Sequence, residues 1–390
     1  MRSSFIWFFT IFFTLYGLIN GYIFSGGFRA LPRGSKWRLW YAIFFWLFPA
    51  AFLVGRWLES CCISSASSLL VWMGSYWLGA LLYLFLATLI ADVWRLARRL
   101  AGRKRDNAPA AERFRLRIAA VIVAVVGIAL ISGHINSRFP AVRTIEININ
   151  KPAEHIKELT IALASDIHLG TIIGRGRIDR IVNVINELKP DVILLAGDVL
   201  DEDTGPVIRQ NLGESLRQLQ APLGVYAITG NHEYIGGAED AVAYLTEHGI
   251  RVLRDEMTII DGVIQLVGRE DRSMPRFTGR ERLPLTDLLG SADTRLPLIV
   301  LDHQPYDLDE AADNGVDLQL SGHTHNGQLW PLNYIITKIY EIGYGYGRKG
   351  AAQFYVSCGA GTWGPPVRLG HRPEIARLIL TFGQPPADTP

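Results

Sequence analysis

Five short stretches of the chain carry the carboxylates, amide and imidazoles that bind metal ions. They are Asp166-Ile167-His168, Gly197-Asp198, Gly230-Asn231-His232-Glu233, Asp302-His303 and Gly322-His323-Thr324-His325. Oxygen and neutral imidazole ligands suit Mn, Fe or Zn ions. Nearly every stretch follows a short apolar run that is typical of a buried strand. Together, in this order, the five stretches predict one hydrolytic site that holds two metal ions.

The spacing indicates how the first ligands act. Asp166 and His168 lie two residues apart on an expected extended chain end, so both side chains should face one ion. Asp198 follows Gly197 after the next apolar run, and a carboxylate there can bridge two ions with one oxygen to each. The sequence therefore predicts a pair of metal ions that share Asp198.

The remaining stretches supply further ligands and a candidate acid. Asn231 and His232 are neighbours that we expect to point apart, so that one binds metal and the other performs acid chemistry. The candidate metal ligands are then Asp166, His168, Asp198, Asn231, His303, His323 and His325. Because a closed structural zinc site would be richer in cysteine, this set favours catalysis.

These residue types point to hydrolysis of a phosphoester. Two cations lower the pKa of a bridging water and neutralise phosphoryl oxygens as charge builds in the transition state. We therefore expect a metal-bridging hydroxide to attack directly, without a protein nucleophile. Asp198 and His232 are the predicted catalytic residues, and the ligand types do not distinguish Mn, Fe and Zn.

The first third of the chain is strongly apolar. Four stretches are nearly free of charge and approach the roughly 20 residues that a membrane-spanning helix needs. They cover residues 5–23, 39–54, 69–91 and 118–135, within a predicted transmembrane region 1–136. Pro49 interrupts the second stretch, which leaves a re-entrant segment open. Arg2 precedes the first stretch, which leaves a signal peptide open.

The basic residues of this region predict its orientation. Short loops rich in Lys and Arg stay in the cytoplasm, and such residues collect between the first and second stretches and between the third and fourth. The run between Arg95 and Arg117 lies between two apolar stretches, so it predicts topology rather than a nucleic-acid partner. Four crossings then place the soluble part on the extracytoplasmic side of a cell (inner) membrane.

The soluble part shows the alternation typical of an α/β domain with a mixed sheet system. We expect strands at 159–164, 191–196, 225–229, 298–301, 318–320, 353–358 and 375–381, with crossover helices between several of them. The pair Asp261-Gly262 predicts a hairpin of antiparallel strands. Because ligands bind beyond the carboxyl ends of parallel strands, the metal candidates should meet at one edge. Residues 137–154 are expected to form a linker into a first strand, and 384–390 a disordered tail.

The order of the motifs resembles the calcineurin-like metallophosphoesterases, within their bacterial, membrane-anchored phosphodiesterase branch. The resemblance covers about residues 155–383 and implies a four-layer sandwich of two mixed sheets flanked by helices, here preceded by about four transmembrane helices. It implies a first ion held by Asp166, His168, Asp198 and His325, and a second held by Asp198, Asn231, His303 and His323. It also implies that His232 protonates or stabilises the leaving oxygen.

The expected substrate is a phosphodiester or phosphomonoester, and a tether near the bilayer favours one carried by a lipid or a cell-envelope polymer. Arg348 and Arg368 are candidate substrate contacts, the latter in a stretch that resembles the family's closing loop. Two alternatives stay open: an inactive membrane scaffold or sensor with structural metals, and a cytoplasm-facing pyrophosphatase that acts on a nucleotide-linked lipid. His155, His248 and His371 have no partner motif and are left out of the site.

Overall fold

The computed structural model describes residues 2–102, 108–153 and 156–383. The expected tail 384–390, His155 and part of the basic loop after residue 102 lie outside the described residues. The chain divides into two compact units. One comprises Met1–His134 with Gly364–Val367, and the other comprises Ile135–Trp363 with Arg368–Pro390.

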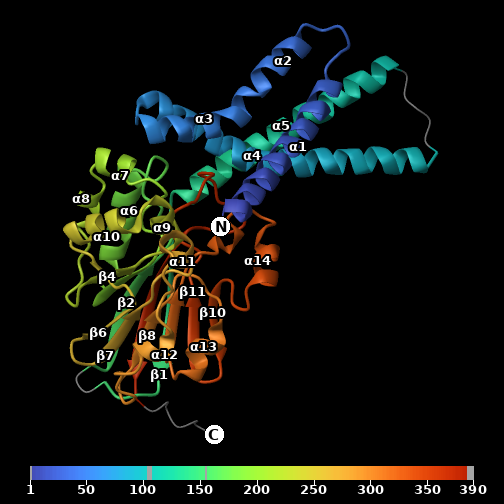
Figure 1. Ribbon diagram of the computed structural model, residues 1–390. Helices are drawn as coiled ribbons and strands as arrows, with labels where there is room; N and C mark the ends of the chain where they lie inside the picture. The colour runs from blue at the N-terminus through green and yellow to red at the C-terminus, as the bar shows by residue number, and fades with distance from the viewer. Residues whose placement is uncertain (1, 103–107, 154–155, 384–390) are drawn as a thin grey trace. The chain divides into compact units, whose positions relative to one another are not determined.

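The first unit is built from long apolar helices (Figure 1). They are α1 (Arg2–Ala30), α2 (Trp37–Phe45), α3 (Leu47–Cys61), α4 (Ser65–Leu100) and α5 (Ala108–Ser137). Four stretches in the described part of the chain are long and apolar enough to cross a membrane: Thr10–Ala30, Trp37–Cys61, Ser65–Leu100 and Ala110–Ser137. The predicted region of about four long apolar helices is confirmed.

The second of these stretches is broken between α2 and α3 at Trp46. Pro49 explains the break, because proline has no N–H to donate and its ring clashes with the carbonyl four residues earlier. That carbonyl belongs to Phe45, where α2 ends. The two helices together still form a predominantly apolar segment of 25 residues, enough in length for a crossing.

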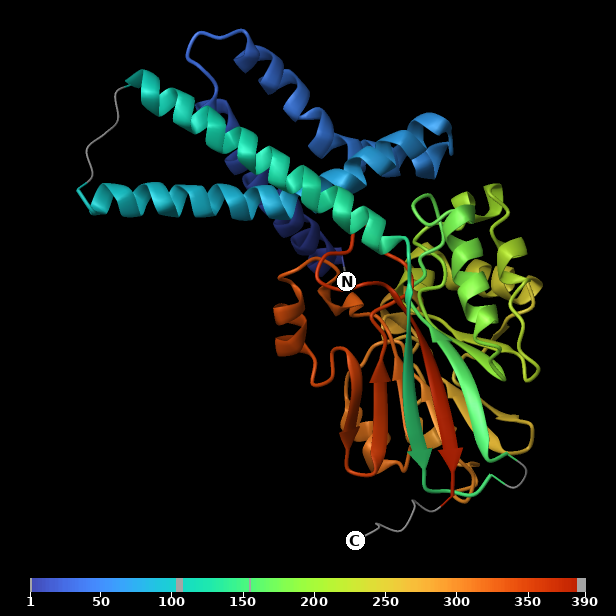
Figure 2. The same ribbon diagram turned by 180° about the vertical axis from the view of Figure 1, so that it is seen from behind.

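The second unit contains two six-stranded sheets (Figure 2). The first has the order β1 (Ala141–Ile149), β12 (Glu374–Phe382), β2 (Glu158–Ala164), β3 (Val192–Ala196), β4 (Val225–Ile228) and β5 (Arg251–Val252). Strands β2 to β5 are parallel, β12 is antiparallel to β2, and β1 is parallel to β12. The segment 137–154, expected as a linker into a first strand, contains β1.

The second sheet is also mixed. Its order is β10 (Gly345–Lys349), β11 (Ala352–Val356), β9 (Leu318–Ser321), β8 (Leu298–Leu301), β7 (Ile264–Gly268) and β6 (Glu256–Ile260). Strands β7, β8, β9 and β11 are parallel, whereas β6 and β10 are antiparallel edge strands. The predicted hairpin at Asp261-Gly262 joins β6 to β7 and is confirmed.

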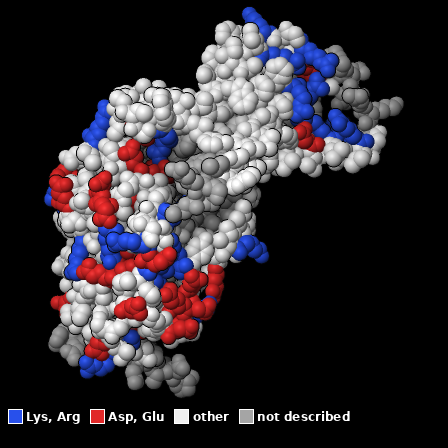
Figure 3. All heavy atoms as spheres, in the orientation of Figure 1, with Lys and Arg blue, Asp and Glu red and all other residues white. Residues whose placement is uncertain are grey.

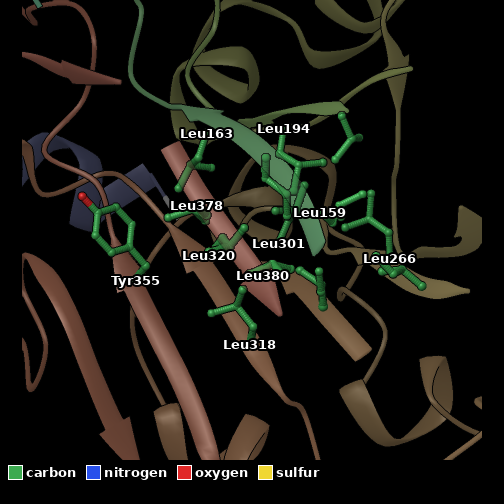
Figure 4. Packing of buried hydrophobic residues seen from close by; sticks show 14 of the residues in the cluster. Leu159, Leu163, Leu194, Leu266, Leu301, Leu318, Leu320, Tyr355, Leu378 and Leu380 are labelled. Atoms are coloured by element: carbon green, nitrogen blue, oxygen red, sulfur yellow. The ribbon is translucent and has the colours of Figure 1, made fainter. Parts of the chain in front are cut away.

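The two sheets pack face to face around one apolar core. Leu163, Leu194, Leu301, Leu320 and Leu378 lie between them (Figure 4). Both faces of the central parallel strands are covered, so nearly every side chain in them is buried. These strands are therefore continuous apolar runs in the sequence.

Helices cover the outer faces of both sheets, which completes the predicted four-layer sandwich (Figures 1 and 2). Helices α6 (Arg175–Glu187), α7 (Gly205–Arg209), α8 (Gly213–Leu216) and α10 (Ala238–Glu247) lie on the side of the first sheet. Helices α12 (Leu285–Leu288) and α13 (Leu308–Asp313) pack on the second sheet. Three short helices, α9 (Asn231–Gly236), α11 (Met274–Thr278) and α14 (Asn333–Ile339), lie near one end of the sheets.

Candidate metal centre

The candidate ligands all follow parallel strands. In chain order, β2 is followed by Asp166 and His168, β3 by Asp198, β4 by Asn231 and His232, β8 by His303, and β9 by His323 and His325. Because the carboxyl ends of parallel strands lie at one edge of a sheet, each sheet delivers its share of these residues to one edge. The described structure brings the seven ligand candidates and His232 together there.

The loops that carry the ligands have an unusual backbone. Five ligand candidates have a positive φ: Asp166 (50°), His168 (54°), Asp198 (51°), His323 (71°) and His325 (49°). Such a conformation in a residue other than glycine costs on the order of 1–3 kcal/mol and persists only where the surrounding structure enforces it. Here the loops are linked to one another, since Asp166 N–H donates to the carbonyl of Gly197 at 3.0 Å and His168 N–H to that of Asp198 at 3.0 Å.

Two expectations about this backbone are therefore wrong. Asp166 and His168 do not lie on an extended chain end, because both residues are left-handed. Asn231 and His232 do not alternate along an extended segment either, because they form the first turn of α9. Their side chains diverge through helical rotation of about 100° per residue instead.

One group of ligand atoms comes from Asp166, His168 and His325. The two Nε2 atoms of His168 and His325 lie 3.1 Å apart, and His325 Nε2 lies 3.4 Å from Asp166 Oδ1. All three side chains are buried. Nitrogen and oxygen atoms that converge in this way without an intervening hydrophobic group can share one cation.

A second group comes from Asp198, Asn231, His303 and His323. Asp198 Oδ2 lies 3.1 Å from His303 Nε2, and Asn231 Oδ1 lies 2.8 Å from His323 Nδ1. Asp198 Oδ2 also lies 3.9 Å from His168 Nε2 of the first group. The carboxylate of Asp198 thus lies between the two groups, where a bridging ligand is needed.

The environment of His303 fits a metal ligand. Its Nδ1 lies 2.8 Å from the carbonyl of Ala196, so Nδ1 carries the proton that it donates there. Its Nε2 is buried and faces Asp198 Oδ2 at 3.1 Å. Burial would lower the pKa of His303, but Asp198 holds that pKa well above its usual value. A cation held at Nε2 would have to displace any proton there, because metal and proton compete for the same lone pair.

The charges of the other ligands suit a cation as well. Burial, reinforced by His232, lowers the pKa of His168 to about 3, which keeps its imidazole neutral. Burial alone would raise the pKa of Asp198, but the neighbouring imidazoles of His303 and His232 outweigh it and hold the pKa well below the usual value. A neutral imidazole and an ionised carboxylate are the forms that bind metal.

His232 lies beside the ligands, where two aspartates favour its protonated form. Its backbone N–H donates to Asp198 Oδ1 at 2.8 Å, and its Nδ1 lies 3.2 Å from Asp201 Oδ1. Burial would lower the pKa of His232, but Asp198 and Asp201 raise it to about 9. The ring centroids of His232 and Trp363 lie 5.9 Å apart, and the two rings meet edge to face. A protonated imidazole in this position can donate a proton to a leaving oxygen.

Sequence reasoning missed Asp201, Glu202 and the role of Glu233. Asp201 lies three residues after Asp198, and a second carboxylate at that distance is the signal that could have identified a partner for His232. Glu202 Oε1 also lies 3.9 Å from His232 Nδ1. Glu233 is buried and accepts three backbone N–H groups, those of Asp198, Leu200 and Gly230, at 3.0, 2.9 and 2.7 Å. Glu233 therefore ties the loop that carries Asp198 to the start of α9.

Replacing Glu233 with alanine should destabilise the fold by about 3 kcal/mol, because it leaves three buried donors without an acceptor. Glu233→Gln should cost less, since one amide oxygen can still accept. We expect both results from denaturant unfolding of the full chain in detergent, followed by tryptophan fluorescence. The control is Glu247→Ala at an exposed position of α10. A loss no larger in Glu233→Ala than in this control would contradict the assigned role.

Gly322 allows the loop after β9 to approach the loop after β2. A Cβ atom at position 322 would lie 2.7 Å from Ser165 Cβ and closer still to Asp166 Oδ2. In addition, His323 N–H donates to both carboxylate oxygens of Asp166, at 2.9 and 3.0 Å. A side chain at position 322 would therefore separate ligands that belong to one group.

We expect Gly322→Ala to weaken Mn²⁺ binding by about 10- to 100-fold, the usual cost of disturbing the support of a metal ligand. The measurement is a Mn²⁺ titration of the metal-stripped full chain. Gly176→Ala is the matched control, because a Cβ atom there meets no atom within 4 Å. Equal Mn²⁺ affinity in the two variants would show that the close approach is dispensable.

Arg368 is buried and turned toward the protein. Its guanidinium donates to the carbonyls of Gly359 and Gly361, at 3.3 and 2.8 Å, and lies 3.2 Å from His325 Nδ1. It also reaches His371, whose Nε2 lies 2.9 Å from the carbonyl of His325. These contacts indicate that Arg368 positions His325, and a direct contact between Arg368 and substrate stays a prediction.

Arg348 lies away from the ligands. It pairs with Gln353 at the start of β11, and β11 runs parallel to β9, whose opposite end leads to His323. Its guanidinium donates to the hydroxyl of Tyr346 at 2.7 Å. The structure does not bring Arg348 to the site, so this position does not support a contact with substrate.

Comparison with known proteins agrees with this geometry. A model of the family named calcineurin-like phosphoesterase matches residues 159–327. An uncharacterized metallophosphoesterase from Aquifex aeolicus is 35% identical over 227 residues, which are 58% of this chain and 85% of that protein. With the fold and the ligand geometry above, this similarity shows that the chain belongs to the calcineurin-like metallophosphoesterases.

Two further relatives align with a larger part of the chain. An uncharacterized metallophosphoesterase from Campylobacter jejuni is 28% identical over 384 residues, 94% of this chain and 96% of that protein. A transmembrane protein with metallophosphoesterase domain from Danio rerio is 33% identical over 294 residues, 72% of this chain. The alignment spans 66% of the length of that Danio rerio protein. The similarity therefore extends beyond the metal-binding unit.

Proposed function

We propose that the protein is a membrane-anchored phosphoesterase that uses two divalent metal ions, Mn, Fe or Zn, to hydrolyse phosphodiester or phosphomonoester bonds. The observation that carries this proposal is the position of Asp198 between two groups of buried ligands. It fits the membrane-anchored phosphodiesterase branch of the family. An inactive scaffold would not need a protonated histidine beside a shared carboxylate.

We assign the ligands as follows. The first ion takes Asp166, His168, Asp198 and His325, and the second takes Asp198, Asn231, His303 and His323. When bound, two such cations supply an acidified water and the positive charge that offsets the phosphoryl oxygens.

The protein's own groups orient the reaction. His303 is held by the carbonyl of Ala196, and Glu233 fixes the loop that carries Asp198. His232 holds a proton at Nε2 while Asp201 accepts from Nδ1, so His232 is oriented to protonate the leaving oxygen. Because His232 directly follows the proposed ligand Asn231, the acid lies beside the place where the phosphoester bond would be cleaved.

We propose that the catalytic unit lies on the extracytoplasmic side of the membrane. Lys and Arg side chains gather around the end of the helical unit where α1 ends (Figure 3), as the loops retained in the cytoplasm do. A reporter that is active on only one side of the membrane, fused after Pro390, tests this side. Activity of a cytoplasm-specific reporter would instead favour the alternative of a pyrophosphatase that faces the cytoplasm.

The test of the activity uses the purified full chain with Mn²⁺. We expect turnover of bis(4-nitrophenyl) phosphate or of 4-nitrophenyl phosphate that is lost with a chelator and restored by Mn²⁺, Fe²⁺ or Zn²⁺. Absence of turnover with all three metals, on these esters and on a phospholipid ester, would favour the inactive scaffold.

A further inference from the structure

The chain enters the second unit at the edge that carries the ligands. Helix α5 ends at Ser137 and β1 begins at Ala141, with three residues between them. Ala141 is paired with Glu374 at the start of β12, and β12 runs antiparallel to β2. The start of β1 therefore lies at the same edge of the first sheet as the end of β2, with β12 between them, and Asp166 follows that end of β2.

Hydrogen bonds inside the second unit hold this entry point in place. Ser137 accepts from Arg177 at 2.7 Å, and the side chain of Asn136 donates to the carbonyl of His371 at 2.7 Å. The backbone N–H of Ala141 donates to the carbonyl of Pro373 at 2.8 Å. The end of the last apolar helix is thus fixed to the segment that also carries Arg368.

The length of the connection limits how far this edge lies from the bilayer. Three residues span at most roughly 10 Å when extended. The polar layer on each side of the hydrocarbon core is about 5–8 Å thick. Because α5 is apolar almost to its end, this short connection keeps the start of β1 within reach of the lipid headgroups.

An exposed apolar surface lies at the same edge. It consists of Trp330, Tyr334, Ile335 and Ile339, with exposed fractions of 52, 62, 53 and 55%, and we call it the α14 surface. No residue of α14 is buried. Helix α14 follows His323 and His325 closely in the sequence, and Trp330 N–H donates to the carbonyl of Leu369 at 2.9 Å. The α14 surface is therefore anchored beside the ligand loops.

The composition of the α14 surface matches a bilayer interface. Trp and Tyr are enriched where membranes meet water, and a surface helix that lies there combines apolar residues with lysine, as Lys338 does here. Charged side chains of the second unit are visible over β6 to β8 and over α12 and α13, and also over α8 and α10 (Figure 3).

We infer that the α14 surface inserts into the interfacial layer of the bilayer, so that the metal centre acts on phosphoesters held at the level of the lipid headgroups. This inference rests on the proposed function for its substrate, a phosphoester whose apolar part stays in the membrane. The occupant to which we commit is lipid, because only three residues separate α5 from the edge of the second unit that carries this surface.

Lipid contact is measured without reference to activity. In the full chain with Cys61→Ser and Cys62→Ser, a fluorophore is attached through Ile339→Cys, and the buried Cys358 is retained. The control carries Ile259→Cys, which is 53% exposed on β6 near the hairpin at the opposite end of the sheets. We expect vesicles of brominated phosphatidylcholine to quench the first probe several-fold more strongly than the second. Equal quenching of the two probes, or cross-linking of position 339 to a second protein instead, would overturn the inference.

The second part of the inference, that the substrate lies at the level of the lipid headgroups, is tested with two esters. The variant Tyr334→Ser, Ile335→Ser, Ile339→Ser should hydrolyse phosphatidyl-4-nitrophenol in vesicles roughly tenfold or more slowly, because burying one such side chain is worth more than tenfold in partitioning. Its turnover of soluble bis(4-nitrophenyl) phosphate should match that of wild type and of Ile259→Ser. A parallel loss on both esters would contradict the inference. If wild type hydrolyses neither of these esters nor 4-nitrophenyl phosphate, the proposed function fails, and the quenching result still decides whether the α14 surface contacts lipid.

Discussion

Replacing Asp198 with asparagine should lower turnover of bis(4-nitrophenyl) phosphate by about 10³-fold or more. Removing a single electrostatic stabiliser of a transition state already costs about 10²- to 10³-fold, and Asp198 serves both ligand groups at once. Its Oδ2 lies 3.1 Å from His303 Nε2 and 3.9 Å from His168 Nε2. Asparagine keeps the shape of the side chain but removes the charge that two cations would share.

The control for this loss is Asp240→Asn, a matched change at an exposed position of α10. Its turnover should stay near that of wild type, since surface substitutions rarely change the free energy of unfolding by more than about 0.5 kcal/mol. The rates are measured at saturating Mn²⁺, so that a change in metal affinity alone is not mistaken for a change in turnover. Turnover in Asp198→Asn within about tenfold of wild type would contradict the bridging role.

Replacing His232 with alanine should have an effect that depends on the leaving group. A general acid contributes about 10²- to 10⁴-fold where the leaving oxygen needs a proton. We therefore expect a loss of that size on an alkyl phosphodiester, and a much smaller loss on 4-nitrophenyl esters, whose leaving group departs as a stable anion. The measurement is the ratio of kcat on the two esters in wild type and variant.

Asp201→Asn refines the same prediction. Asp201 Oδ1 lies 3.2 Å from His232 Nδ1, so the variant keeps a polar partner but removes the charge that supports protonation. Its loss should show the same dependence on the leaving group and be smaller than that of His232→Ala. Equal losses on alkyl and aryl esters in both variants would mean that His232 does not act as the acid.

The sequence alone predicted the α/β architecture because the central strands are buried on both faces. Runs such as Val192–Ala196 and Leu298–Leu301 are apolar at every position, and an aspartate follows each of them within two residues. Strand β1 was harder to recognise, since its burial is irregular and the first half is largely exposed. Its place beside β12 depends on residues more than 200 positions away, which no local pattern reports.

The ligand types could be read from the sequence, but their backbone could not. Asp166 and His168 adopt left-handed conformations, which are uncommon in residues other than glycine, although Asp and His accept them more readily than most. Hydrogen bonds between distant loops enforce these conformations, for example the donation from His323 N–H to Asp166. The sequence therefore predicted correctly that Asp166 and His168 lie close together, but it predicted the wrong backbone conformation for them.

Interactions between distant segments also determine where the two candidate arginines lie in the structure. Arg368 was selected because it lies in a loop that resembles one in the family, and the structure uses it to hold His325 and nearby carbonyls. Arg348 was the other candidate substrate contact, and strand register carries it to the opposite end of the second sheet. A positive charge in the sequence does not indicate which end of a strand it will occupy.

The most direct test of the account is the number of metal ions that the protein binds. Elemental analysis of the purified full chain, loaded with Mn²⁺ and freed of excess metal, should give two ions per chain in wild type and fewer in Asp198→Asn. Two ions in wild type and a loss in the variant would agree with two groups of ligands joined by one carboxylate. One ion or none in wild type, or two ions retained in Asp198→Asn, would contradict it.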